Sequence, residues 1–272
     1  MKIHTNKLSG TVRSPLIAVI TGASSGIGRA TALQLAAGGA HVMLVARRKE
    51  KLDEVAEEIS AFGGNARVIP ADVSVFQQVE EAVRIVVEKE GHIDVLINNA
   101  GYGVYGSVEE CGFSDYENQI KVNFLGAVYF TKVVLPIMHQ ANRGSIIVVS
   151  SIYGDTTLPF YSGYCASKFA LNSYTDILRR ELGGTGIDVS LVCPGPVETE
   201  FESSITQRRS RRNIRKLLPA VSAENVADEI IKCINNPKRK VIIPRVRKLQ
   251  IVFQFLFPQV YEWYYRKRGA PI

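Results

Sequence analysis

The stretch TGASSGIG, residues 21–28, follows the apolar run LIAVI and leads into a helical pattern, GRATALQLAAGG. A glycine-rich turn of this kind lets backbone approach a pyrophosphate, which the free N–H groups and positive dipole end of the helix attract. A tight turn without a ligand would also select glycines, and the spacing differs from the GxGxxG fingerprint. The stretch therefore predicts a strand–turn–helix unit, with phosphate binding as one of two interpretations.

Short aliphatic runs alternate with longer amphipathic stretches along the whole chain. The runs are LIAVI, HVMLV, ARVIP, IDVLI, SIIVVS, IDVSLV and KVIIP. Such runs are typical of strands that are buried on both faces. The stretches between them, such as KEKLDEVAEEISAFGG and FQQVEEAVRIVVEKEG, have helical periodicity and end on glycine. This alternation predicts an α/β fold, a doubly wound parallel sheet with helices on both faces and ligands beyond the carboxyl ends of the strands.

The composition indicates one large hydrophobic core. Of the 272 residues, 46% are hydrophobic and 22% are charged, which suits one domain or at most two. No opening stretch combines a basic start, an apolar run and a cleavage site, so we expect a cytoplasmic protein. The 4 cysteines form no CxxC pair and the 4 histidines are scattered, so we expect neither a metal site nor a disulfide framework.

Three further motifs follow TGASSGIG in order. INNAG, residues 97–101, ends the fourth predicted strand, where its loop would flank the same crevice. Backbone capping by Asn98 and Asn99 in a turn is the other interpretation of this motif. YCASK spans residues 164–168 and PGPVET spans residues 194–199. With this ordered set, the chain resembles the classical short-chain dehydrogenases/reductases from about Leu16 to Ile243.

The resemblance implies a Rossmann-type sheet of seven strands and hydride transfer between a nicotinamide cofactor and an alcohol or carbonyl carbon. The family's catalytic residues fall on Asn123, Ser151, Tyr164 and Lys168. We prefer Ser151 to its neighbour Ser150 because it stands at the family's usual separation from the tyrosine. By family precedent Tyr164 is the acid/base, Ser151 binds the carbonyl oxygen, Lys168 also binds the nicotinamide ribose, and Asn123 holds a proton-relay water.

Helical spacing favours Tyr164 over Tyr161 as the reactive phenol. Residues four apart share a helix face, so Lys168 can lie beside Tyr164, whereas Tyr161 is two turns from the lysine. Lowering a phenol pKa from about 10 to roughly 7 needs on the order of 4 kcal/mol. One positive charge about 4 Å away contributes nearly that much. Because burial opposes the shift, we expect the positive charge of the oxidised nicotinamide to help. The alternative is an amphipathic helix face without chemistry.

The segment LVARRKE, after the second predicted strand, bears on the choice of cofactor. Ala46 stands where NAD-preferring relatives carry an acid, and Arg47 and Arg48 follow it. Arginine attracts the 2′-phosphate of NADP, so we expect NADP(H). Two arginines that simply begin a solvated helix are the alternative. Asp72 would cap the adenine by family precedent, although a loop turn or a helix cap would explain it equally.

The remaining cofactor contacts are expected in loops at the same edge of the sheet. PGPVET follows the sixth predicted strand, and its proline and glycine exclude regular helix there. The resemblance places Thr199 near the carboxamide or the pyrophosphate. The full set of expected cofactor-binding residues is Gly22, Ser24, Ser25, Gly26, Ile27, Gly28, Arg47, Arg48, Asp72, Val73, Asn99, Ala100, Gly101, Tyr164, Lys168, Pro194, Gly195, Val197 and Thr199.

The basic character of the chain lies in its last quarter. From residue 205 onward, 16 Lys and Arg face 4 acidic residues, a net +12, so the preceding part carries −5 of the total of +7. We predict a single domain over residues 1–245, with a substrate lid at about 198–219. The lid stretch QRRSRRNIRK is either a solvated face or a contact for an acidic or phosphate-bearing substrate or an anionic surface.

Residues 246–272 are predicted to form a hydrophobic and basic C-terminal extension. Its apolar stretch is shorter than the roughly 20 residues that a spanning helix needs. We interpret it as a cover for the substrate entrance or a subunit contact, with peripheral membrane contact as the second interpretation.

The substrate class is open between two kinds of carbonyl compound. We expect a lipophilic, steroid-, retinoid- or lipid-like ketone or aldehyde, because the hydrophobic extension resembles that of such reductases. A 3-oxoacyl thioester on an acyl carrier protein is the alternative, and a catalytically lapsed dinucleotide-binding regulator is a different class. We expect a homo-oligomer, a dimer or a tetramer. Zinc-finger, helix-turn-helix and RRM patterns are missing from the sequence, so we expect no nucleic-acid partner.

Overall fold

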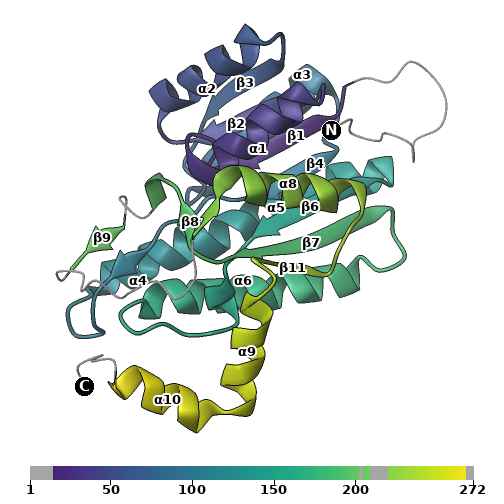
Figure 1. The fold of residues 1–272 in the computed structure, drawn as a ribbon. Coiled ribbons are helices and arrows are strands. Elements are labelled where there is room, and N and C mark those ends of the chain that lie inside the picture. The colour runs from purple at the N-terminus through teal and green to yellow at the C-terminus, as the bar shows by residue number, and fades with distance from the viewer. Residues whose placement is uncertain (1–14, 202–204, 209–219, 268–272) are drawn as a thin grey trace.

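The computed structural model describes residues 15–201, 205–208 and 220–267. Its central sheet has seven parallel strands, in the order β11-β7-β6-β4-β1-β2-β3 (Figure 1). The strands are β1 (Ile17–Thr21), β2 (His41–Ala46), β3 (Asn65–Pro70), β4 (Val95–Asn98), β6 (Gly144–Val149), β7 (Ile187–Pro194) and β11 (Lys240–Ile243). The strand order reverses between β1 and β4, so the predicted Rossmann-type, doubly wound fold is confirmed.

Helices cover both faces of the sheet (Figure 1). One face carries α1 (Gly26–Ala37), α2 (Lys49–Ala61) and α8 (Ala223–Asn235). The other carries α3 (Phe76–Glu90), α5 (Gly126–Ala141) and α6 (Ser162–Glu181). In β1, Ile17 and Val19 join one core while Ala18 and Ile20 join the other. Burial on both faces explains why the strands have continuous apolar runs.

Shorter elements surround the sheet. They are α4 (Phe113–Ile120), the π-helical η1 (Lys121–Leu125), the 3₁₀ turn η2 (Ile152–Gly154), α9 (Arg247–Leu256) and α10 (Pro258–Lys267). Two small parallel pairs join β5 (Val104–Tyr105) to β9 (Thr206–Gln207), and β8 (Val197–Glu198) to β10 (Val221–Ser222). Of the predicted lid, residues 202–204 and 209–219 lie outside the described residues, so its limits and the domain boundary at residue 245 stay predictions.

One continuous helical stretch, Phe113–Ala141, is long and apolar enough to cross a membrane by length and composition alone. It consists of α4, η1 and α5. Phe130, Val134 and Met138 of α5 are fully buried in the core beneath the sheet. We therefore assign this stretch to the helix layer of the Rossmann-type fold.

Gly28 lies where α1 crosses the end of β1. A Cβ atom at this position would lie 2.2 Å from the carbonyl oxygen of Gly22 and 2.6 Å from Nδ2 of Asn99. The Gly22 oxygen is a backbone atom, so no side-chain rotation can relieve its overlap with the added Cβ. The close approach of helix and strand therefore requires glycine at this position.

We expect Gly28→Ala to lower the free energy of unfolding by about 3 kcal/mol, because overpacking forces the backbone apart. Gly91→Ala is the matched control, since Gly91 has a φ of 77° but no atom within 4 Å of an added Cβ. The control should lose only about 1 kcal/mol, the cost of a left-handed backbone. Urea unfolding of both variants measures the difference, and equal losses would contradict the packing argument.

Candidate active site

Two positions in the β1–α1 turn use backbone conformations that favour glycine. Gly22 has a φ of 67° and Gly26 a φ of 55°. Ser25, the N-cap of α1, makes no side-chain hydrogen bond to the first amides of the helix. Thr199 packs against Gly26. A Cβ atom added at Gly26 would lie 3.2 Å from the Cβ of Thr199. The turn therefore forms a backbone cradle at a helix N-terminus that can hold an anion.

The loop after β4 is hydrogen-bonded to the same turn. Asn99 Nδ2 donates to the carbonyl oxygens of Thr21 at 2.9 Å and Gly22 at 3.2 Å. The amides of Asn99 and Ala100 donate to Thr21 Oγ1 at 3.0 Å and 3.1 Å. Asn99 thus has the structural role considered for it from the sequence. It fixes Ala100 against Gly22, and Gly101 follows toward the interior.

Arg48 lies beside the cradle. Its Nη2 donates to Ser24 Oγ and Ser25 Oγ, each at 3.2 Å, and lies 3.7 Å from the Glu200 carboxylate. The side chain is still half exposed, so its guanidinium can also meet a ligand from solvent. Ile27, in the first turn of α1, accepts a hydrogen bond from Thr31 and packs on the core.

Arg47 is exposed and faces Asp72 at 3.8 Å across the ends of β2 and β3. Asp72 Oδ1 accepts hydrogen bonds from the amide and hydroxyl of Ser74 at 2.9 Å and 2.7 Å, so Asp72 also stabilises a turn. Val73 is buried and packs tightly against Gly126. The two arginines and Asp72 therefore lie together at one end of the cradle.

The four residues predicted to be catalytic come from three separate segments. Tyr164 and Lys168 lie one turn apart on α6, Ser151 follows β6 as the N-cap of η2, and Asn123 lies in η1. All four are buried, with exposed fractions of 8%, 3%, 5% and 1% respectively. The structure thus brings together the set that the sequence motifs indicated.

Lys168 is a buried cation beside Tyr164. Its Nζ lies 5.8 Å from the centroid of the Tyr164 ring and donates to the Val149 carbonyl at 3.2 Å. A Cβ on Gly101 would lie 3.5 Å from this Nζ, so the loop after β4 passes directly by it. Among the described residues no carboxylate pairs with Lys168, and burial lowers the pKa of its ammonium to about 8. Two of its three donors are therefore open to a ligand.

In the protein without cofactor, the pKa of Tyr164 is dominated by the effect of burial. Burial raises it above the ordinary value of 10.0, and a hydrogen bond with the Ser151 side chain only partly opposes this. The Lys168 ammonium lies beside the ring but does not reverse this shift. Desolvation of the phenolate outweighs the attraction because the ring is packed among other aromatic side chains.

Asn123 connects the π-helical turn to two other segments. Its Oδ1 accepts from the Tyr102 amide at 2.9 Å, and its Nδ2 donates to the Tyr102 carbonyl and to Ser167 Oγ, both at 2.9 Å. Ser167 precedes Lys168 on α6. Asn123 therefore positions the loop after β4 against the helix that carries Tyr164 and Lys168.

The two neighbouring serines have different surroundings. Ser151 Oγ accepts from the Tyr153 amide at 3.2 Å, donates to the Pro194 carbonyl at 3.5 Å and hydrogen-bonds Tyr164. Ser150 Oγ is buried and has no hydrogen-bond partner among the residues that the structure describes. The contact with Tyr164 favours Ser151 for the catalytic position.

The loop after β7 lies at the same edge of the sheet. The Gly195 amide donates to the Ile243 carbonyl at 2.7 Å, which ties the loop to β11. Val197 pairs with Val221 in the β8–β10 ribbon. The Thr199 hydroxyl accepts from the Phe201 amide at 3.2 Å, and Phe201 in turn reaches Tyr164.

An aromatic cluster around Tyr164 was missed from the sequence. Tyr161, Tyr105 and Phe201 surround the Tyr164 ring, and Ile205 completes the cluster. The ring centroids of Tyr164 and Phe201 are 5.8 Å apart, and those of Tyr164 and Tyr161 are 6.3 Å apart. The stretch LPFYSGY was the available signal, but Tyr105 and Phe201 come from distant segments of the chain. The surroundings of the phenol are therefore strongly apolar.

A second missed feature joins the lid to α4. Arg208 donates two hydrogen bonds to the buried Asp115 carboxylate, at 2.9 Å and 2.7 Å. The paired guanidinium holds the pKa of Asp115 below its ordinary value. One arginine of the predicted basic lid is therefore paired with a carboxylate of the protein itself.

Comparison with known proteins agrees with this geometry. The family model described as short chain dehydrogenase matches residues 16–210. The zebrafish (Danio rerio) protein named dehydrogenase/reductase SDR family member 7B is 32% identical over 255 residues, which cover 90% of this chain and 82% of the relative. The ketoacyl reductase HetN of Nostoc is 32% identical over 256 residues, covering 90% and 88% respectively.

Two solved structures share the fold. A short-chain dehydrogenase/reductase from Burkholderia phymatum, in complex with NAD, has a TM-score of 0.82 and 26% identity over 91% of this chain and 95% of its own. An alcohol dehydrogenase from Thermococcus sibiricus, complexed with 5-hydroxy-NADP, has a TM-score of 0.75 and 27% identity over 85% and 96%. From its sequence match and its fold, the chain belongs to the short-chain dehydrogenase/reductase family of oxidoreductases.

Proposed function

We propose that this protein interconverts a carbonyl group and an alcohol by hydride transfer with NADP(H), with Tyr164 as the acid/base. The observation that carries the proposal is the buried Lys168 ammonium beside Tyr164, which no described carboxylate neutralises. A buried cation without a partner costs several kcal/mol. Hydroxyl groups of a nicotinamide ribose at this point would satisfy its free donors.

The residues along this edge fit a dinucleotide. The cradle of Gly22 and Gly26 suits a pyrophosphate, because it lies at the N-terminus of α1, where unpaired amides and the positive end of the helix dipole attract an anion. Lys168 suits the nicotinamide ribose at one end, and Arg47 and Arg48 suit the adenosine end. The other cofactor contacts expected from the sequence lie in the loops between these points.

In the reducing direction Tyr164 would donate its phenolic proton to the carbonyl oxygen, and the Ser151 hydroxyl would hydrogen-bond the same oxygen as charge develops there. A reduced nicotinamide held by Lys168 and the cradle would supply the hydride for the carbonyl carbon, and with the proton from Tyr164 this would complete the two-electron reduction. Lys168 would stabilise the phenolate that remains on Tyr164. Asn123 would hold the water that returns a proton to it.

Tyr164→Phe should lower kcat by a factor of about 10² to 10⁴, because it removes the proton donor and keeps the ring. Tyr174→Phe, on the same helix but packed against Phe124, is the control and should retain activity. NADPH oxidation by the two purified variants measures kcat for each. Full activity of Tyr164→Phe would remove the assignment.

The substrate that we propose is a lipophilic ketone or aldehyde, because the Tyr164 phenol is surrounded by apolar aromatic rings. A 3-oxoacyl thioester is the second candidate, supported by the similarity to a ketoacyl reductase. The activity assay should therefore include a free lipophilic ketone and a carrier-bound β-ketoacyl thioester, and the higher kcat/KM identifies the class. A catalytically lapsed regulator would reduce neither of the two substrates.

We propose NADP(H) as the cofactor because of the charges after β2. Arg47 and Arg48 lie there, and Ala46 leaves no carboxylate to repel a 2′-phosphate. Solved relatives do not decide the point, since one is described with NAD and another with an NADP derivative.

Replacing both Arg47 and Arg48 by alanine should raise KM for NADPH at least about tenfold, since charge-assisted hydrogen bonds contribute about 1.5–3 kcal/mol. KM for NADH should change far less. Lys51→Ala, a neighbouring cation of α2 that pairs with Glu54, is the control. An equal rise in both KM values would show that the arginines act only on the turn.

We further propose a cytoplasmic homo-oligomer, a dimer or a tetramer, consistent with the family. Helices α4, α5 and α6 are the surface proposed for subunit contact, since Ile177 and Phe113 on them are exposed. The proposed domain spans residues 1–245, with a substrate lid at about 198–219.

A further inference from the structure

Helices α9 and α10 form an arm that projects from the lower end of the molecule (Figure 1). We call this arm, residues 247–267, the C-terminal hairpin. A solvent-exposed helix normally turns apolar residues inward and polar residues outward. In α9 this order is reversed.

The outward face of α9 is apolar. Its exposed large side chains include Leu249, Val252, Phe253 and Leu256, which have the i, i+3, i+4, i+7 spacing of one helix face. Adjacent to them, Phe255 is 84% exposed and Phe257 52%. On α10, Val260 and Trp263 continue the exposed apolar surface.

The inward face of α9 is largely polar and is firmly attached. Gln254 hydrogen-bonds Thr156, and the Tyr261 hydroxyl of α10 lies 3.3 Å from the same Thr156 oxygen. Arg247 is buried and donates to Gln250 at 2.7 Å, while Ile251 packs on the core. These contacts fix which face looks outward, so the apolar exposure follows from the docking of the hairpin.

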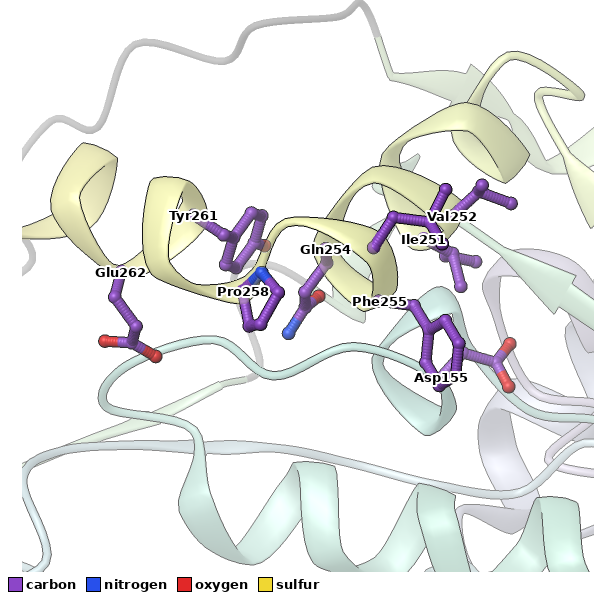
Figure 2. A pocket seen from close by; sticks show the side chains of 9 residues that line it. Asp155, Ile251, Val252, Gln254, Phe255, Pro258, Tyr261 and Glu262 are labelled. Carbon is purple, nitrogen blue, oxygen red and sulfur yellow. The ribbon is translucent and has the colours of Figure 1, made fainter.

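A groove of about 510 Å³ separates the hairpin from the loop after η2 (Figure 2). Ile251, Val252, Phe255, Leu256 and Pro258 supply apolar lining, and Asp155 and Glu262 lie at its edges. A space of this size can take part of an acyl chain or another apolar group. Together with the exposed face it makes the hairpin a largely apolar surface.

The charges around this surface indicate what covers it. Residues 249–261 contain no charged side chain, whereas Arg245 and Lys248 precede them and are exposed. In the sequence Arg266, Lys267 and Arg268 follow. A second copy of the hairpin would bring like charges together, but phospholipid head groups would neutralise them. We propose that the C-terminal hairpin is a monotopic docking surface for an anionic lipid membrane.

The uncharged stretch of 13 residues is too short to span a bilayer and is interrupted by Pro258. The hairpin therefore lies in the interface, with its exposed aromatic and aliphatic side chains among the acyl chains and with Arg245 and Lys248 at the phosphates. Thr156, its attachment point, lies five residues after Ser151 in the same loop. If the proposed function is correct, the membrane face adjoins the active site and favours a substrate dissolved in lipid.

Flotation with phosphatidylcholine vesicles, with and without phosphatidylglycerol, tests the proposal and needs neither cofactor nor substrate. We expect the full chain to bind the anionic vesicles. The double variant Phe255→Ser with Trp263→Ser should bind at least about tenfold more weakly, since each side chain loses burial in lipid. Arg245→Ser with Lys248→Ser should weaken binding to the anionic vesicles alone.

The matched control is Phe62→Ser with Val108→Ser, two exposed apolar side chains away from the hairpin. All substitutions are at exposed positions, and equal melting temperatures confirm that the variants fold. No vesicle binding by the full chain, or an equal loss in the control, would overturn the proposal. A dimer without lipid that the Phe255/Trp263 variant dissociates, with no vesicle binding, would overturn it too and identify a second copy as the partner.

Discussion

The buried ammonium of Lys168 is the constraint on which the site depends. Its hydrogen bond to Val149 aligns α6 with the end of β6, and the loop after β4 passes within contact of it at Gly101. Asn123 holds that loop in place from η1. Burial lowers the pKa of Lys168 and raises that of Tyr164, so both charged forms are disfavoured in the free protein. Groups perturbed in this way are typical of catalytic sites.

The fold could be predicted from the sequence because strands that are buried on both faces have continuous apolar runs. All five residues of β1 are buried, and the same is true of most of β2 and β6, so their apolar runs were unambiguous. The proposed catalytic pair, Tyr164 and Lys168, could be placed because one helical turn separates the two residues. Their neighbours Ser151 and Asn123 came from the family pattern, and the fold brings all four together.

Other features depend on contacts that the sequence does not display. Burial raises the pKa of Tyr164, and the cluster that buries the ring includes Tyr105 and Phe201 from distant segments, so the size of this opposing effect could not be predicted from helical spacing. Periodicity shows that α9 is amphipathic but not which face docks. The hydrogen bond from Thr156 to Gln254 decides this, and it turns the apolar face outward.

The central claim is that a nicotinamide dinucleotide completes the electrostatics of this site. Ultraviolet absorbance of the phenolate, titrated in the wild type and in Tyr164→Phe, isolates the ionisation of Tyr164 with and without NADP⁺. The account predicts a pKa above the ordinary value of 10.0 in the free protein and a clear fall below it when NADP⁺ is bound. The same titration curve in both states would contradict it.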